Sequence, residues 1–100
     1  MKIKNERGYT ELEIMAKAEY SDFCSFANQL QEKLSITFIN KVDDFDGLYW
    51  TFNYNNFIIV LAYNVFLGIA VYPYNGIHVS ESENLNVEKF AEVLTEYQLI

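Results

Sequence analysis

Residues 48–72 read LYWTFNYNNFIIVLAYNVFLGIAVY, and this stretch decides the fold of the 100-residue chain. Asn55 and Asn56 separate two runs that are rich in aromatic and β-branched side chains, which favour strands. Asparagine tolerates the left-handed backbone conformation that a two-residue hairpin turn requires. The sequence therefore predicts an antiparallel hairpin of two strands, at residues 48–54 and 57–63.

This turn also fixes which side chains of the two strands face one another. One face of the hairpin is wholly apolar or aromatic, with the cross-strand pairs Leu48–Tyr63, Trp50–Leu61, Phe52–Ile59 and Tyr54–Phe57. The other face is mixed, with the pairs Tyr49–Ala62, Thr51–Val60 and Asn53–Ile58. Because burial yields about 25 cal/mol per Å² of apolar area, we predict that the Trp50 face meets the helices. The mixed face is then either an ordinary exposed sheet surface or a protein-binding surface.

The run 57–72 has 16 residues and no charge, which raises the question of a membrane-spanning helix. A spanning helix needs about 20 apolar residues, and Asn64 and Gly68 interrupt this run. Two buried strands around a turn explain it better. We therefore predict a turn between Asn64 and Gly68 and a further strand at 69–72, which Pro73 ends by removing a hydrogen-bond donor.

On the N-terminal side, residues 9–18 alternate between apolar and polar side chains and predict a half-solvated strand. Apolar residues then recur at helical spacing and predict a helix over 22–34, with Ser21 as its N-cap. Residues 35–42 alternate again and predict a second strand, and the aspartate-rich residues 43–47 predict a loop.

On the C-terminal side, residues 77–79 fit a short extra strand and residues 81–84 a polar loop. Asn86 then caps a last helix over 87–98, whose apolar stripe faces the core. The element order is β-α-β-β-β-β-α, which predicts an α+β fold: an antiparallel sheet of about five strands with two helices packed on one face. We expect a single domain over 1–100, because a second would be too small to bury its own core.

The charge distribution is uneven. The chain has 7 Lys and Arg against 14 Asp and Glu, a formal net charge of −7. Residues 1–42 are neutral overall, so the whole imbalance falls in 43–100, where the acids stand on either side of the uncharged residues 47–80. Such acidity argues against nucleic-acid binding. It either keeps a sheet-rich protein soluble or forms a face for a basic partner protein. The candidate partner-binding residues are Asp43, Asp44, Asp46, Tyr49, Tyr74, Glu81, Glu83, Glu88, Glu92 and Glu96.

No catalytic or metal-binding motif is present. His78 and Cys24 are the only residues of their kinds, so no ligand pair has the spacing of a zinc site and no internal disulfide forms. The aspartates from Asp43 onward are similar to the start of a calcium loop, but Gly47 is misplaced and Tyr54 occupies the position where that loop needs Glu. We therefore expect no enzyme, no cofactor and no metal.

The segments 49–54, 59–63 and 66–73 resemble those of small bacterial immunity proteins that accompany contact-dependent growth inhibition toxins. The resemblance implies a non-enzymatic cytoplasmic protein that binds and blocks one toxin domain, and it carries over no individual functional residue. Many such toxin domains are nucleases, whose phosphate-holding surfaces are basic and would suit an acidic inhibitor. The alternative is a small cytoplasmic regulatory domain with another protein or ligand as partner. The basic N-terminus is not followed by the apolar segment of a signal peptide, and we expect a monomer or weak dimer without membrane contact.

Overall fold

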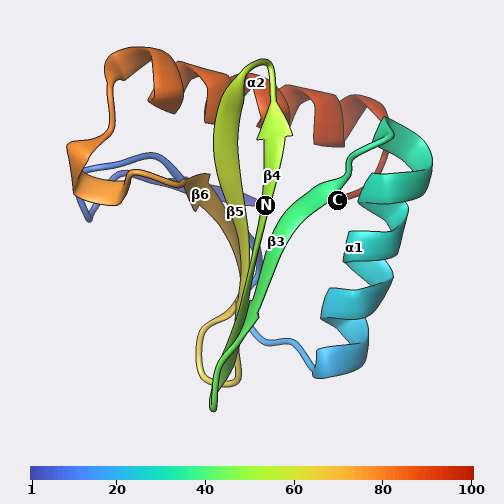
Figure 1. Ribbon diagram of the computed structural model, residues 1–100. Helices are drawn as coiled ribbons and strands as arrows, with labels where there is room; N and C mark the ends of the chain where they lie inside the picture. Colours follow the sequence, from blue (N-terminus) through green and yellow to red (C-terminus); the bar gives the residue numbers. More distant parts are fainter.

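The computed structural model describes residues 1–100 and contains six strands, two α-helices and one 3₁₀-helix. The strands form a single sheet in the order β1-β2-β6-β5-β4-β3, with every neighbouring pair antiparallel (Figure 1). The predicted α+β class is confirmed, with six strands instead of about five. In chain order the elements are β1 (Lys2–Lys4), β2 (Glu11–Met15), α1 (Tyr20–Leu34), β3 (Phe38–Asp43), β4 (Gly47–Tyr54), β5 (Phe57–Asn64), β6 (Gly68–Pro73), the 3₁₀-helix η1 (Gly76–His78) and α2 (Glu81–Glu96).

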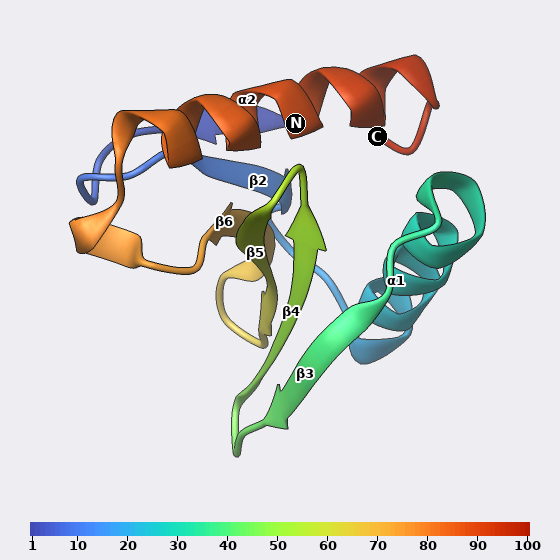
Figure 2. The same cartoon turned by 45° about the horizontal axis from the view of Figure 1, so that its top comes forward.

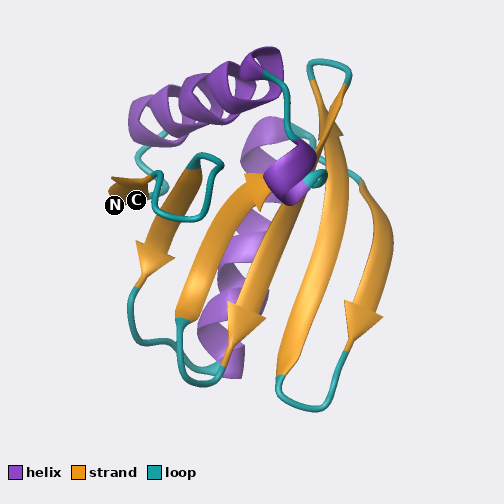
Figure 3. Ribbon diagram, turned by 90° about the vertical axis from the view of Figure 1, so that its left-hand side faces the viewer, coloured by secondary structure: helices purple, strands orange, loops and turns teal.

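Both helices cover the same face of the sheet, as predicted. One cluster of 17 buried apolar residues joins the inner sides of α1 and α2 to alternate residues of β2, β4, β5 and β6. Figure 2 shows α2 along one end of the sheet and α1 beside β3 and β4. Figure 3 views the sheet from its other face, with α1 behind the strands. The sheet therefore has one face in the core and one face without a helix.

The hairpin prediction for β4 and β5 is confirmed in register. Phe52 pairs with Ile59 and Trp50 with Leu61, and Asn55 and Asn56 take φ angles of 54° and 69° in the turn. The Trp50 face is the core face, since Phe52, Ile59 and Leu61 are each 0% exposed. Trp50 itself is half-buried, because it lies next to the edge strand β3.

The predicted N-cap of α1 is wrong. Glu19, not Ser21, is the N-cap, and its backbone N–H donates to the Asp22 carboxylate at 2.8 Å. Asp22 stands three residues after Glu19, the spacing at which a side chain reaches back to the N-cap amide. Ser21 lies inside the first helical turn and is exposed.

The predicted start of α2 is also wrong by six residues. Ser80 and Glu83 form a capping box, so the helix begins at Glu81 and includes the predicted polar loop 81–84. Asn86 is not a cap but a buried residue, 4% exposed, whose side-chain amide donates to the backbone oxygen of Tyr54 at 3.0 Å. That bond ties α2 to the end of β4.

Two short elements also differ from the prediction. Residues 77–79 do not form a strand, because the 3₁₀-helix η1 occupies this connection. The strand β1 was not predicted: its three residues are mostly exposed and pair only with β2, where Lys4 forms an ion pair with Glu13 at 2.6 Å. The uncharged run 57–72 forms β5 and β6, as predicted, and no helix is long and apolar enough to cross a membrane.

Candidate functional site

Two turns lie side by side at the end of the sheet farthest from α2 (Figure 1). They are the β3–β4 turn, residues 43–47, and the β5–β6 turn, residues 64–68, and together we call them the tip. The backbone N–H of Val65 donates to the backbone oxygen of Asp46 at 3.3 Å, which joins the two turns. The tip is therefore one continuous surface formed by two separate segments of the chain.

Polar side chains at the tip hold its backbone. The Asn64 side-chain oxygen accepts hydrogen bonds from the backbone N–H groups of Phe66 and Leu67, at 2.8 and 3.2 Å. The Asp44 carboxylate likewise accepts from the Phe45 N–H at 3.0 Å. Short polar side chains often stabilise turns in this way. Here they leave the apolar side chains of both turns facing solvent.

The exposure of these apolar side chains is the most unusual feature of the tip. Phe45 is 103% exposed, Phe66 80%, Leu67 61% and Val65 55%. Turns are normally built from Gly, Asn, Asp, Ser and Pro, and a contiguous apolar patch on a monomer marks an interaction surface more often than scattered apolar residues do. The tip combines aromatic and aliphatic side chains with acids, a composition suited to contact with another protein.

A hollow of about 290 Å³ adjoins Phe45 at the tip. Tyr20 and Tyr63 line it together with the turn residues Asp44 and Asp46. Tyr20 comes from the first turn of α1 and is 59% exposed. Carboxylates and aromatic rings around one hollow attract a Lys or Arg side chain by charge and by cation–π contact.

Asp43 has a different environment from the other two aspartates. Its carboxylate accepts a hydrogen bond from the Trp50 indole N–H at 3.1 Å, and the Lys41 ammonium lies 4.3 Å from the centre of the Trp50 ring. Asp43 is thus tied to the edge of the sheet, while Asp44 and Asp46 supply the carboxylates beside Phe45.

Of the remaining predicted site residues, only Tyr49 reaches the tip: it lies on the helix-free face of the sheet, with its hydroxyl end beside Gly47. Tyr74, 60% exposed, lies in the connection from β6 to α2. Glu83 is engaged in the α2 capping box and also accepts from the Asn75 side chain at 2.9 Å. The other acids of α2, which are all exposed and lie at the end of the molecule opposite the tip, are Glu81, Glu88, Glu92 and Glu96.

The apolar part of this candidate site was not predicted from the sequence. The sequence nevertheless indicates this apolar part, because the turn at 65–67 consists of Val65, Phe66 and Leu67, and Phe45 stands between two aspartates. The place of Tyr20 at this site could not be predicted from the sequence, since only the fold brings the start of α1 beside the β3–β4 turn.

His78 and Cys24 lie in separate elements. His78 is exposed in η1, and Cys24 is half-buried in α1. A hydrogen bond with the Cys24 thiol raises the pKa of the Tyr20 hydroxyl. No group of three or more His, Cys, Asp or Glu side chains lies close enough together to hold a metal ion.

In comparisons with known proteins, the chain matches no family model, no curated sequence and no solved structure.

Proposed function

We propose that this chain is an immunity-type inhibitor that binds a basic protein domain through the tip and blocks it. The observation that supports this proposal most is Phe45, a fully exposed aromatic side chain between two aspartates. Val65 lines the same hollow as Phe45, and Phe66 and Leu67 are exposed on the same adjoining turn. A folded chain gains nothing from presenting this cluster to water. The cluster gains free energy when a partner covers it.

The size of the apolar side chains is sufficient for an interface anchor. A buried aromatic side chain removes roughly 150–250 Å² from water, and such anchors contribute about 2–4 kcal/mol to a protein–protein interface. The flanking aspartates add charge-assisted hydrogen bonds if the partner presents Lys or Arg.

The net charge of −7 supports a basic partner. Complementary charge speeds the encounter of two proteins and suppresses wrong partners. A nuclease toxin domain has a basic surface because it holds phosphate groups, and an inhibitor that covers this surface excludes the substrate. The acids of α2 lie at the opposite end, so in this proposal they contribute to long-range attraction and solubility and not to the contact.

A growth assay tests the proposal. The gene for a secreted toxin that lies beside the gene of this chain supplies the toxin domain, and cells express that domain with or without the chain. We expect the wild-type chain to restore growth. The variant Phe45→Ser with Asp44→Asn and Asp46→Asn should fail to restore it, whereas the control variant with Glu88, Glu92 and Glu96 changed to Gln should still protect. The absence of such a neighbouring toxin, or a lack of protection by the wild-type chain, contradicts the proposal.

A further inference from the structure

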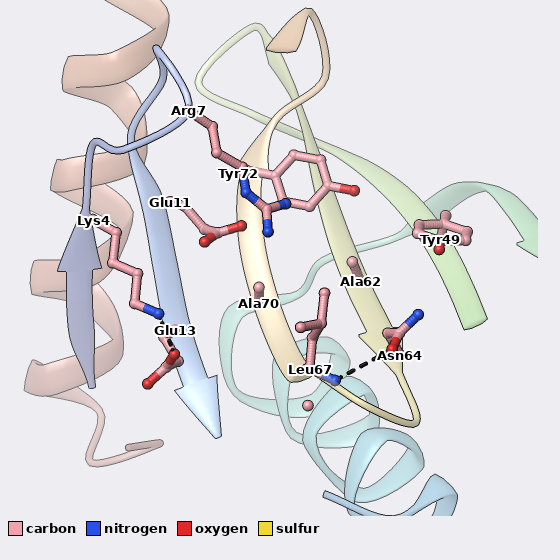
Figure 4. A pocket seen from close by; sticks show the side chains of 11 residues that line it. Lys4, Arg7, Glu11, Glu13, Tyr49, Ala62, Asn64, Leu67, Ala70 and Tyr72 are labelled. Atoms are coloured by element: carbon pink, nitrogen blue, oxygen red, sulfur yellow. Dashed lines mark hydrogen bonds and ion pairs between the residues drawn. The ribbon is translucent and has the colours of Figure 1, made fainter. Parts of the chain in front are cut away.

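The helix-free face of the sheet contains a second hollow, of about 300 Å³ (Figure 4). Its floor is formed by Ala62 of β5 and Ala70 of β6, which are direct cross-strand partners in the middle of the sheet. On this face of the same two strands, the pair on one side is Val60 with Tyr72 and the pair on the other side is Asn64 with Gly68. The hollow exists because two small side chains and a glycine stand beside the large Tyr72.

An Ala–Ala pair is a poor choice for stability alone. Alanine is depleted in strands, and larger β-branched or aromatic pairs stabilise a sheet across neighbouring strands. The space above Ala62 and Ala70 is therefore a feature that folding does not require.

Aromatic rings stand on two sides of this floor. Tyr72 borders the hollow on one side and packs against Tyr9 with ring centres 5.6 Å apart, while Tyr49 borders it from β4. Burial raises the pKa of Tyr72 to about 12. The floor and these rings form an apolar slot for a hydrocarbon or aromatic group.

Charged groups of both signs line the side of the hollow nearest β1 and β2. Lys4 and Glu13 neutralise one another in the only ion pair of the structure. Arg7 and Glu11 also line the hollow but form no ion pair, and Figure 4 shows both reaching toward Tyr72. One guanidinium and one carboxylate thus stand close together beside the apolar slot, without an ion pair between them.

The loop that carries Arg7 is anchored. The backbone N–H of Thr10, which is 2% exposed, donates to the Asn84 side chain of α2 at 2.8 Å, and the Thr10 hydroxyl donates to the Asn5 side chain at 3.1 Å. The hydroxyl of Tyr9 and then the charge of Glu11 raise the pKa of Arg7, so both groups lie close to its guanidinium. The backbone of this loop is therefore held by the fold, while the Arg7 side chain itself is exposed.

We propose that this hollow binds a free amino acid with an apolar or aromatic side chain. The guanidinium of Arg7 receives the α-carboxylate, the carboxylate of Glu11 receives the α-ammonium group, and the side chain lies over Ala62 and Ala70. A zwitterion matches Arg7 and Glu11 better than a singly charged ligand does. A cation would bring a positive charge to Arg7, and an anion would bring a negative charge to Glu11. The volume is at the small end of the range for ligand pockets, which suits a molecule of this size.

Three ligands test the role of the two charges: L-phenylalanine, its amide and its N-acetyl derivative, each titrated into the labelled protein and followed by NMR shifts. We expect L-phenylalanine to bind in the millimolar range or tighter, and each derivative about tenfold more weakly, because each lacks one charge. The two derivatives also distinguish a free amino acid from a peptide terminus as the ligand, because a terminal residue carries either the α-ammonium group or the α-carboxylate but not both. If the amide or the N-acetyl derivative binds as well as the free amino acid, the zwitterion assignment is overturned.

Substitutions of residues that line the hollow test whether the ligand binds there. Arg7→Gln and Glu11→Gln should each weaken L-phenylalanine binding about tenfold, while the matched control Glu6→Gln, an exposed change in the same loop, should leave it unchanged. Ala70→Leu should fill the hollow and abolish binding, and Ala62→Val is the smaller alternative if Ala70→Leu does not fold.

Two outcomes overturn the proposal: unaltered binding in the filled variants, or no binding by phenylalanine, tryptophan, leucine, isoleucine, valine or methionine at about 10 mM. The tip variant Phe45→Ser should keep the ligand, so failure of this proposal is distinguishable from failure of the proposed inhibitor function.

Discussion

Replacing Gly68 by alanine should destabilise this protein far more than the same replacement at Gly8. Both glycines have φ near +86°, so both variants carry the same backbone strain. A Cβ at Gly8 would meet nothing within 4 Å. A Cβ at Gly68 would overlap the backbone oxygen of Met15 and lie 2.8 Å from the carbonyl carbon of Ala16. The two variants therefore separate the cost of backbone conformation from the cost of the close approach between β2 and β6.

The expected magnitudes follow from these contacts. A left-handed conformation costs a non-glycine residue about 1–2 kcal/mol, and alanine recovers about 0.4–1 kcal/mol by stiffening the unfolded chain. Gly8→Ala should thus lower the free energy of unfolding by about 1 kcal/mol. At Gly68 the obstacle is backbone and cannot rotate away, so β2 must shift from β6, and we expect a loss of about 4 kcal/mol. With about 4–8 °C per kcal/mol for a domain of this size, the melting temperature should fall by roughly 4–8 °C for Gly8→Ala and by roughly 16–32 °C for Gly68→Ala.

Urea denaturation and thermal melts of the two variants measure these losses. The comparison tests the sheet order, because only the placement of β2 beside β6 brings Met15 over Gly68. Equal losses in the two variants, or a loss at Gly68 of only about 1 kcal/mol, would show that β2 does not lie where the structure places it.

Three further predictions concern the core edge, the helix-free face and the link between the β1–β2 loop and α2. Trp50→Ala should lose about 2–4 kcal/mol in urea denaturation, because the ring packs edge-on against Phe23 at 4.8 Å yet stays half-exposed; an unchanged midpoint would contradict its place on the core face. Burial raises the pKa of Tyr72 from 10.0 to about 12, so above pH 10 the unfolded state loses the proton first and stability falls as the pH rises from about 10 to about 12, by roughly 1–2 kcal/mol because solvent still reaches part of the side chain. Tyr72→Phe should flatten this alkaline loss, and an identical pH profile would argue against the burial. Asn84→Ala should cost about 1–2 kcal/mol and speed hydrogen exchange at the Thr10 amide, its buried donor; unchanged exchange would contradict that anchor.

The central hairpin and its core face could be predicted from the sequence because a local signal and a periodic signal agree there. The two asparagines fix the turn, the turn fixes the register, and only one face of the resulting pair is continuously apolar. The boundaries of α1 and α2 were less predictable. In both helices an acid three residues after the N-cap decides where the helix begins, and Glu19 and Ser80 compete with nearby residues that also suit a cap.

The candidate site was predictable only in part. The acidity of residues 43–46 is plain in the sequence, but the sequence gives no distance between these acids and those of α2, and the structure places the two groups at opposite ends. The hollow above Ala62 and Ala70 depends on the pairing of β5 with β6 and on the return of the N-terminal residues to the far side of β6. Those contacts join segments distant in the chain, and no local pattern encodes them.

The central claim is the proposal that the tip binds a basic toxin domain, and the affinity of that contact tests it most directly. Calorimetric titration at low and moderate salt should compare the wild-type chain, the tip variant with Phe45→Ser, Asp44→Asn and Asp46→Asn, and the helix variant with Glu88, Glu92 and Glu96 changed to Gln. We predict that the tip variant loses about 100-fold or more in affinity, and that the helix variant loses about threefold or less at moderate salt, where long-range attraction is screened. Full affinity in the tip variant, together with a large loss in the helix variant, would contradict the account and place the contact on α2.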